Sequence, residues 1–162
     1  MVTLGIDPGT ATTGYAIIKS GKQPDEFELA EYGVIETDKK LKDAERLEIL
    51  AADLEQIIKK HKPGCAGIEK LFLTTNQKTA MTVSQARGVA LLLCQRNKLK
   101  IFEFTPLQVK NFICGYGKAD KKQVQFIVQK MFRLKAAPKP DDAADAVAIA
   151  VSAAYQNNKN RF

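Results

Sequence analysis

The sequence predicts an α/β domain built on a mixed sheet of about five strands flanked by helices, and two patterns predict this class. Three short apolar runs joined by turns open the chain, which is typical of an antiparallel meander. After them, strand-like runs alternate with stretches of helical periodicity, which indicates parallel strands joined by crossover helices. With 162 residues, of which 45% are hydrophobic, the chain is long enough to bury one core.

The opening meander is expected to hold strands at residues 1–7, 14–19 and 27–37. Turns at Pro8-Gly9 and at Ser20-Gly21-Lys22 separate these strands, because glycine and proline favour tight turns. Consecutive strands joined by short turns pair in opposite directions.

A helix is expected next, because apolar residues then recur with a 3.6-residue period. These residues are Leu47, Leu50, Ala51, Leu54, Ile57 and Ile58. Pro63 ends the helix, since proline cannot continue it. A strand at residues 65–69, a long helix at about residues 76–97 and a fifth strand at residues 100–104 follow.

Two shorter helices are expected after the fifth strand. Thr105-Pro106 starts the first, because proline is favoured at the first helical position, and the helix stops at Gly115. Asp120 caps the second helix. Its apolar face consists of Val124, Ile127, Val128 and Met131.

An Ala-rich helix closes the chain after a proline-containing break, and Asp141 or Asp142 can cap its N-terminus. No internal repeat or low-complexity linker divides the sequence. We therefore expect residues 1–156 to form a single domain and residues 157–162 to form a short polar tail.

The net charge of +7 is typical of a protein that binds a polyanion. Many small proteins are basic without binding nucleic acid, so the charge gains weight only beside a candidate site. The three cysteines, Cys65, Cys94 and Cys114, have neither the spacing of a zinc site nor that of a disulfide framework, which favours reduced thiols. We find no apolar stretch of membrane-spanning length and no signal peptide, so we expect a protein of the cytoplasm or nucleoid without membrane contact.

Four acidic side chains stand where backbone elements would aim them at a common point. They are Asp7, Glu69, Asp142 and Asp145, called the four acids below. The first two each end an apolar run that is typical of a buried strand, and the other two share one face of the final helix. Singly, the aspartates are typical turn or cap residues, whereas a charged Glu69 after a buried strand is costly without a partner.

Together, the four acids would repel one another unless divalent cations held them, and a site made only of oxygen ligands suits Mg²⁺ or Mn²⁺. Two such ions about 4 Å apart can activate a water, bind a scissile phosphate and stabilise the leaving oxygen. In that scheme Asp7 bridges both ions, while Glu69 and the helical acids hold one ion each. The sequence therefore predicts a catalytic metal site.

Basic residues of the long helix and of the second half of the chain are candidates for phosphate contacts with DNA. They are Arg87, Lys110, Lys118, Lys121 and Lys122. The alternative is a solvated face, which most lysines on amphipathic helices form. Lys121 opposes the dipole at the start of its helix, which favours a role toward a ligand.

Phe72 lies shortly after Glu69 and leads into a polar turn. It is either a core residue or an exposed platform on which an unpaired base stacks, a contact worth about 1–3 kcal/mol. The single histidine, His61, ends a helix, where a partial positive charge suits the helix dipole. We assign His61 no catalytic role.

Several spaced segments resemble the RuvC family of Holliday junction resolvases over nearly the whole chain. They are Gly5-Ile6-Asp7-Pro8-Gly9-Thr10, Thr13-Gly14-Tyr15, Ile68-Glu69, Phe72, Gln85-Ala86-Arg87-Gly88-Val89-Ala90, Gln108-Val109-Lys110, the run Gly115, Gly117, Ala119, Lys121 and Gln123-Val124-Gln125, and Asp142-Ala143-Ala144-Asp145-Ala146. Their number and order make the resemblance specific.

The resemblance implies an RNase H-like fold, a two-fold symmetric homodimer, and paired nicking of four-way DNA junctions with Mg²⁺ or Mn²⁺, in bacterial recombination and repair. The four acids match the family's catalytic metal ligands. Lys110 and Lys121 match basic residues near the cleaved strand, and Phe72 matches the aromatic residue that stacks on bases near the crossover. Family members also act with a branch-migration motor.

One departure from the family pattern is Lys70, where a neutral glutamine is common. Strand alternation would turn its side chain away from the proposed metals, whereas a loop at this point would let it approach the phosphate. Three other functions compete with a resolvase. An ATP-binding protein of the actin and sugar-kinase type shares the first phosphate loop, but it needs a second lobe. A YqgF-like nuclease would act on RNA, and an inactive relative would bind junctions without cutting them.

Overall fold

The computed structural model describes residues 1–23, 26–70 and 77–159, and it confirms the predicted order of strands and helices. The strands are β1 (Val2–Asp7), β2 (Thr12–Ser20), β3 (Phe27–Glu36), β4 (Cys65–Glu69) and β5 (Lys100–Phe104). The helices are α1 (Asp43–His61), α2 (Gln77–Arg96), α3 (Pro106–Cys114), α4 (Lys121–Met131) and α5 (Asp141–Lys159).

The sheet is five-stranded and mixed, in the order β3-β2-β1-β4-β5. The first three strands form the predicted antiparallel meander, and β1, β4 and β5 run parallel, joined by crossovers that contain α1 and α2. Parallel pairing places the C-terminal ends of β1 and β4 at one edge of the sheet. This edge carries Asp7 and Glu69.

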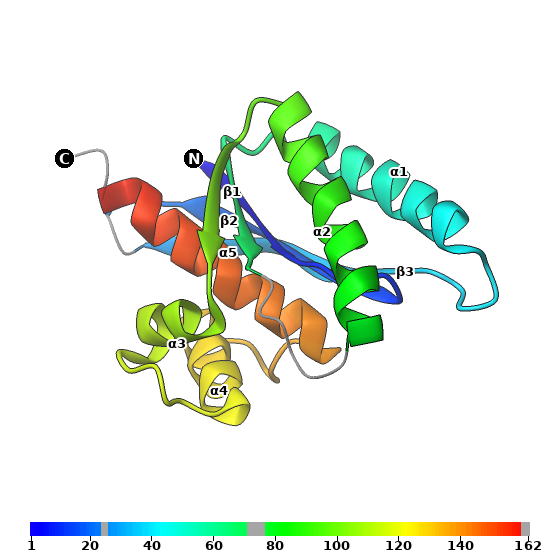
Figure 1. Cartoon of the computed structure of the whole chain (residues 1–162). Helices are drawn as coiled ribbons and strands as arrows, with labels where there is room; N and C mark the ends of the chain where they lie inside the picture. Colours follow the sequence, from blue (N-terminus) through cyan, green and yellow to red (C-terminus); the bar gives the residue numbers. More distant parts are fainter. Residues whose placement is uncertain (24–25, 71–76, 160–162) are drawn as a thin grey trace.

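Helices cover both faces of the sheet, with α1 and α2 on one face and α5 on the other, and α3 and α4 packed beside α5 (Figure 1). Alternating residues of β1 serve the two layers. Leu4 and Ile6 pack in the core under α1 and α2, while Gly5 faces α5. Asp7 has the same parity as Gly5 and therefore belongs to the α5 face.

Glycines let α5 approach the sheet closely. A Cβ atom added at Gly5 would overlap the carbonyl oxygen of Ala146, and one added at Gly14 would overlap that of Asp142. The alanines of α5 that face the sheet are likewise small and fully buried. Small residues on both surfaces thus bring the first turns of α5 against the end of β1.

Asp120 caps α4 as predicted, Thr105 caps α3 although only the helix start was predicted there, and the cap predicted for α5 is absent. The Thr105 side chain accepts from the Gln108 amide at α3, and Asp120 accepts from the Gln123 amide at α4. The expectation that Asp141 or Asp142 caps α5 is wrong, because both lie inside its first turn. The carboxylate of Asp141 instead contacts α4.

Three predicted details differ in the structure. Strand β2 begins at Thr12, two residues before the expected start. Met131 was expected on the apolar face of α4, but it is the last residue of the helix and is 41% exposed. Helix α5 runs to Lys159, and Asn157 is buried where a polar tail was expected, with its amide donating to the Met1 sulfur.

None of the helices in the described residues is long and apolar enough to cross a membrane.

Candidate active site

The ends of β1 and β4 hold the first two acids side by side. The parallel register pairs Gly5 with Gly67 and Ile6 with Ile68, so one further step brings Asp7 beside Glu69. Both side chains share the parity of the glycines that face α5, and both are mostly removed from solvent. Strand alternation and register together therefore direct Asp7 and Glu69 to the same face.

The N-terminal turns of α5 bring Asp142 and Asp145 to the same place. Their spacing of three residues puts them on one helix face, and the contact of the Asp142 carbonyl with Gly14 seats this end of the helix on the sheet. Asp142, Asp145 and Glu69 each raise the pKa of Asp7 through their charges. The structure thus gathers the other three predicted acids around Asp7.

Asp7 experiences the strongest electrostatic effect in this group. Burial is the largest cause, and together with the charges of the other three acids and a hydrogen bond with Glu69 it raises the pKa of Asp7 from 3.8 to about 8. Without a bound cation, a carboxyl group with such a pKa is mostly protonated at neutral pH. The fold therefore holds Asp7 in surroundings that disfavour its charge, as is common at functional sites.

Glu69 and Asp145 share this environment in weaker form. Burial raises the pKa of both carboxyl groups, and the charge of Asp145 raises that of Glu69 further. Lys121 opposes these shifts at both acids, because its ammonium group lies 3.0 Å from Asp145 Oδ2. Among the described residues, Lys121 is thus the cation that lowers the pKa of both Glu69 and Asp145.

A cleft of about 230 Å³ opens beside the acids between β4, α3, α4 and α5. Glu69 and Asp145 lie on its wall together with Lys110 and Lys121. Apolar side chains form the rest of the lining, among them Val109 and Val124. The cleft therefore combines two predicted acids with the two lysines that match the family's basic residues near the cleaved strand.

The donor set suits hard divalent cations, because all four side chains offer carboxylate oxygens. In the described residues, no three or more acidic, histidine or cysteine side chains are arranged so that they alone could hold a metal ion. Mg²⁺ seldom uses such a cage; it commonly takes one or two carboxylates and completes its octahedron with water and substrate phosphate. The residues present fit that mode, and the added positive charge would relieve the repulsion around Asp7.

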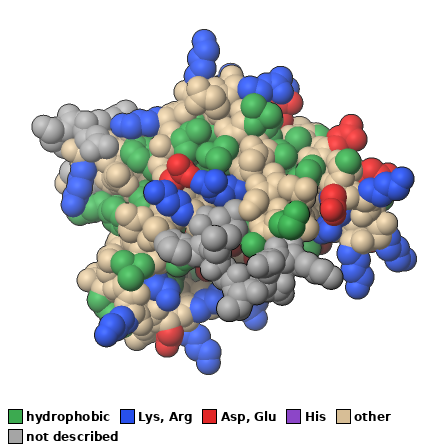
Figure 2. All heavy atoms as spheres, viewed as in Figure 1, with side chains coloured by type: hydrophobic (Ala, Val, Ile, Leu, Met, Phe, Trp, Pro, Cys, Tyr) green, Lys and Arg blue, Asp and Glu red, His purple; other side chains and the backbone are tan. Residues whose placement is uncertain are grey.

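The other predicted DNA contacts have different locations. Arg87 on α2 donates from Nε to the Glu69 carbonyl oxygen at 3.1 Å, and its other guanidinium end pairs with Glu103 of β5. Lys118 is exposed between α3 and α4, and Lys122 lines a separate hollow beside Tyr116 and Phe126. Lysine and arginine side chains spread over the surface of α3 and α4 in Figure 2. Phe72 lies outside the described residues.

Sequence reasoning missed partners that come from other elements. Glu103 pairs with Arg87, while Asp141 pairs with Lys121 and accepts a hydrogen bond from Gln125. The spacing of Lys121 and Gln125 on α4, and of Asp141 and Asp145 on α5, is four residues in each case and signals shared helix faces. That the two faces oppose one another follows only from how α4 packs on α5.

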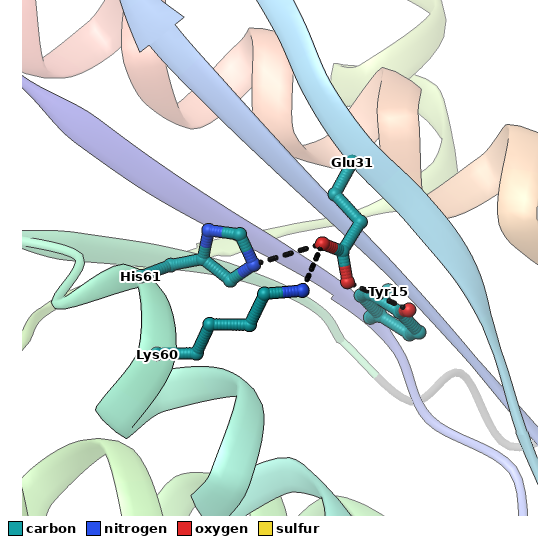
Figure 3. Close-up of polar contacts among 4 residues, drawn as sticks. All are labelled: Tyr15, Glu31, Lys60 and His61. Carbon is teal, nitrogen blue, oxygen red and sulfur yellow. Dashed lines mark hydrogen bonds and ion pairs between the residues drawn. The ribbon is translucent and has the colours of Figure 1, made fainter.

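A second polar group, called the Glu31 cluster, lies on the opposite face of the sheet (Figure 3). It consists of Tyr15, Glu31, Lys60 and His61. Tyr15 donates to one Glu31 carboxylate oxygen at 3.1 Å, and Lys60 and His61 contact the other at 2.5 Å and 3.1 Å. His61 thus ties the end of α1 to β3, away from the four acids.

Comparison with known families places the chain clearly. The family model described as Crossover junction endodeoxyribonuclease RuvC matches residues 3–153. A relative of that description from Caldicellulosiruptor saccharolyticus is 51% identical over 151 residues, which are 93% of this chain and 90% of the relative. One from Halothermothrix orenii is 47% identical over 161 residues, covering 99% of this chain and 96% of the relative.

Solved structures agree with the sequence comparison. The structure of Thermus thermophilus RuvC matches with a TM-score of 0.91 and 27% identity, over 99% of this chain and 97% of that one. The same protein in complex with a Holliday junction substrate also gives a TM-score of 0.91, at 28% identity over 99% and 96% of the two chains. The predicted RNase H-like fold is therefore confirmed.

Proposed function

The chain belongs to the RuvC family of crossover junction endodeoxyribonucleases, and from this premise we propose that it resolves four-way DNA junctions by hydrolysing phosphodiester bonds at the four acids. One observation carries the assignment of the site. Three strand and helix ends converge to hold carboxylates around a buried Asp7 whose pKa is raised to about 8. Such an arrangement is unfavourable for the fold alone and suits a site that binds cations.

We assign the cations as Mg²⁺, for which Mn²⁺ can substitute, with two ions at each site. When bound, such a pair supplies Lewis-acid chemistry: it lowers the pKa of a water and balances charge on the phosphate. Asp7, the most central carboxylate, would contact both ions. Glu69 would hold one ion, and Asp142 and Asp145 would hold the other from α5.

Basic side chains would orient the DNA strand. Lys110 and Lys121 line the cleft that Glu69 and Asp145 enter, which supports a role in holding the phosphate being cut. Arg87, Lys118 and Lys122 lie farther out and would contact neighbouring phosphates. Phe72, close in sequence to Glu69, would stack on a base at the crossover.

A four-way junction is itself two-fold symmetric, so we propose that the chain acts as a homodimer with one acidic site for each opposing strand. Paired nicks would then be symmetric about the crossover. We also propose cooperation with a branch-migration motor, which would deliver new sequence to both sites. This work takes place on chromosomal DNA, in the cytoplasm of a bacterial cell.

The test is cleavage of a labelled mobile four-way junction in Mg²⁺ and in Ca²⁺, beside a linear duplex and an RNA hairpin of equal length. We expect symmetric nicks confined to the junction in Mg²⁺. Ca²⁺ should support binding without cutting, because its looser coordination fits the geometry of in-line displacement poorly. Binding without cleavage in every metal would indicate an inactive binder, and preference for the RNA would indicate a YqgF-like nuclease.

A further inference from the structure

Lys121 lies between two carboxylates of α5 that differ in position and exposure. Its ammonium nitrogen is 3.0 Å from Asp145 Oδ2, in the acidic site, and 3.2 Å from Asp141 Oδ2, one helical turn earlier. Gln125, one turn after Lys121 on α4, donates to the other Asp141 oxygen at 3.0 Å. Two residues of α4 thus oppose two residues of α5, and Asp141 contacts both of its partners on α4.

Asp141 has one general reason to be acidic, because the helix dipole favours a carboxylate in the first turn of α5. It does not cap α5, and its side chain is 62% exposed, so it contributes little to the core. The helix dipole alone does not account for the two contacts that Asp141 makes with α4, one with Lys121 and one with Gln125.

The electrostatics connect Asp141 to Lys121 more than to any other group. The hydrogen bond from Lys121 lowers the pKa of Asp141 first, and the bond from Gln125 follows. At Lys121 burial acts to lower the pKa, but the bonds with Asp145 and then Asp141 outweigh it and raise the pKa. The lysine is held as a cation by both acids.

We propose that Asp141, braced by Gln125, is a positioning residue that keeps Lys121 at the edge of the acidic site. This inference rests on the proposed function, in which Lys121 contacts the phosphate being cut. Long lysine side chains lose considerable rotamer entropy when they are fixed, so a second carboxylate partner helps to hold the Lys121 ammonium group beside the cleft. Asp141 restricts that freedom without being part of the metal site.

Asp141 also reduces the competition between Lys121 and a divalent ion for the carboxylate of Asp145. A divalent ion at Asp145 and the Lys121 ammonium would both seek the same carboxylate, and like charges repel. Asp141 offers Lys121 an alternative carboxylate one helical turn away, so the lysine can leave Asp145 without leaving the cleft. Removing the charge of Asp141 would direct Lys121 onto Asp145 and weaken cation binding there.

The test uses Asp141→Asn, Lys121→Ala and the double variant, with Glu48→Gln on α1 as a control that removes an exposed acid elsewhere. We would measure single-turnover cleavage of a junction in Mg²⁺, junction affinity in Ca²⁺, and Mn²⁺ affinity by calorimetry without DNA. For Asp141→Asn we expect cleavage about tenfold slower, the scale of lost support for a reacting group. Junction affinity should be equal or tighter, because a negative charge is gone, and Mn²⁺ affinity should fall severalfold.

The double variant decides whether Asp141 acts through Lys121. If it does, adding Asp141→Asn to Lys121→Ala leaves both the cleavage rate and the Mn²⁺ affinity where Lys121→Ala alone sets them. The proposal would be overturned if Asp141→Asn cut at the wild-type rate. It would also be overturned if Asp141→Asn slowed cleavage equally with Lys121 present and with Lys121→Ala. Failure of the wild-type protein to cut any junction would instead count against the proposed function, so the two failures are distinguishable.

Discussion

Glu31 and Asp7 are carboxylic acids on the same sheet, and their surroundings are opposite in sign. Glu31 lies on the α1 face and contacts Lys60, His61 and Tyr15, and its pKa is lowered chiefly by the hydrogen bond from Lys60. Asp7 lies on the α5 face among three further acids, and burial together with their charges raises its pKa to about 8. The groups around Glu31 stabilise its negative charge, and the groups around Asp7 destabilise its charge.

The charge of Glu31 stabilises the folded protein, whereas the charge of Asp7 destabilises it. Partners around Glu31 favour its charged form, so ionisation of Glu31 stabilises the folded protein. The same change at Asp7 is unfavourable, because it adds charge to a group of like charges in a poorly solvated place. Residues that weaken the fold are expected where function requires them. The contrast therefore supports the assignment of the four acids as the working site.

The largest expected effect follows Asp7→Asn. This substitution keeps the shape of the side chain but removes a ligand oxygen charge, so junction cleavage should fall at least about a hundredfold. Without metal, the variant should be more stable than the wild type, because it relieves repulsion with Glu69 and the α5 acids. Gel assays of cleavage and urea unfolding in EDTA measure the two quantities.

The critical feature is that the two quantities change in opposite directions: cleavage falls while stability in EDTA rises. A misfolded variant would lose both activity and stability, and junction binding in Ca²⁺ controls for that case. Cleavage at the wild-type rate would remove Asp7 from the reaction. Loss of stability in EDTA would show that Asp7 resembles Glu31 after all.

A second prediction concerns pH. Asp7 binds its proton more tightly in the folded chain than in the unfolded one, so the free energy of unfolding should fall as pH rises from about 4 to about 8. Burial raises the pKa of Glu69 and Asp145 too, and these groups act in the same direction. Saturating Mg²⁺ should reduce this fall, because a bound cation stabilises the charged forms.

Unfolding of the wild type and of Asp7→Asn, each with EDTA and with Mg²⁺, isolates the contribution of this carboxyl group from all other titrations. The difference in stability between the two proteins in EDTA should widen with pH and should shrink in Mg²⁺. A difference that is constant across this range would mean that Asp7 titrates in its ordinary range.

The sequence was sufficient to predict the acidic site and insufficient to predict the Glu31 cluster, and the reason is geometric. Asp7 and Glu69 end apolar strands, and Asp142 and Asp145 begin a helix, so local pattern and parallel pairing bring them together. Glu31 meets Lys60 and His61 across 29 and 30 residues, through the angle at which α1 packs on the sheet. No periodicity encodes that angle.

The same limit explains what was missed near the site itself. Arg87 was predicted from its charge, but its bonds to the Glu69 carbonyl and to Glu103 depend on how α2 lies over β4 and β5. Asp141 had the sequence signature of a cap, and only the contact between α4 and α5 turns it toward Lys121. Residues whose role follows from their own element are predictable, and residues that act between elements require the structure.

The smallest expected effect follows Glu31→Gln, and it completes the comparison. The variant should lose about 0.5–1 kcal/mol of stability at neutral pH, because the ion pair with Lys60 is partly exposed. The pKa of Glu31 is lowered in the folded protein, so this contribution is present above its ordinary value of 4.5 and is lost as pH falls through the lowered value. Junction cleavage should not change.

Tyr15→Phe should lower the stability less than Glu31→Gln does and add little to it, since both remove the same hydrogen bond. Urea unfolding of the two single variants and the double variant measures this, and a change in cleavage rate would mean that the α1 face also serves the reaction.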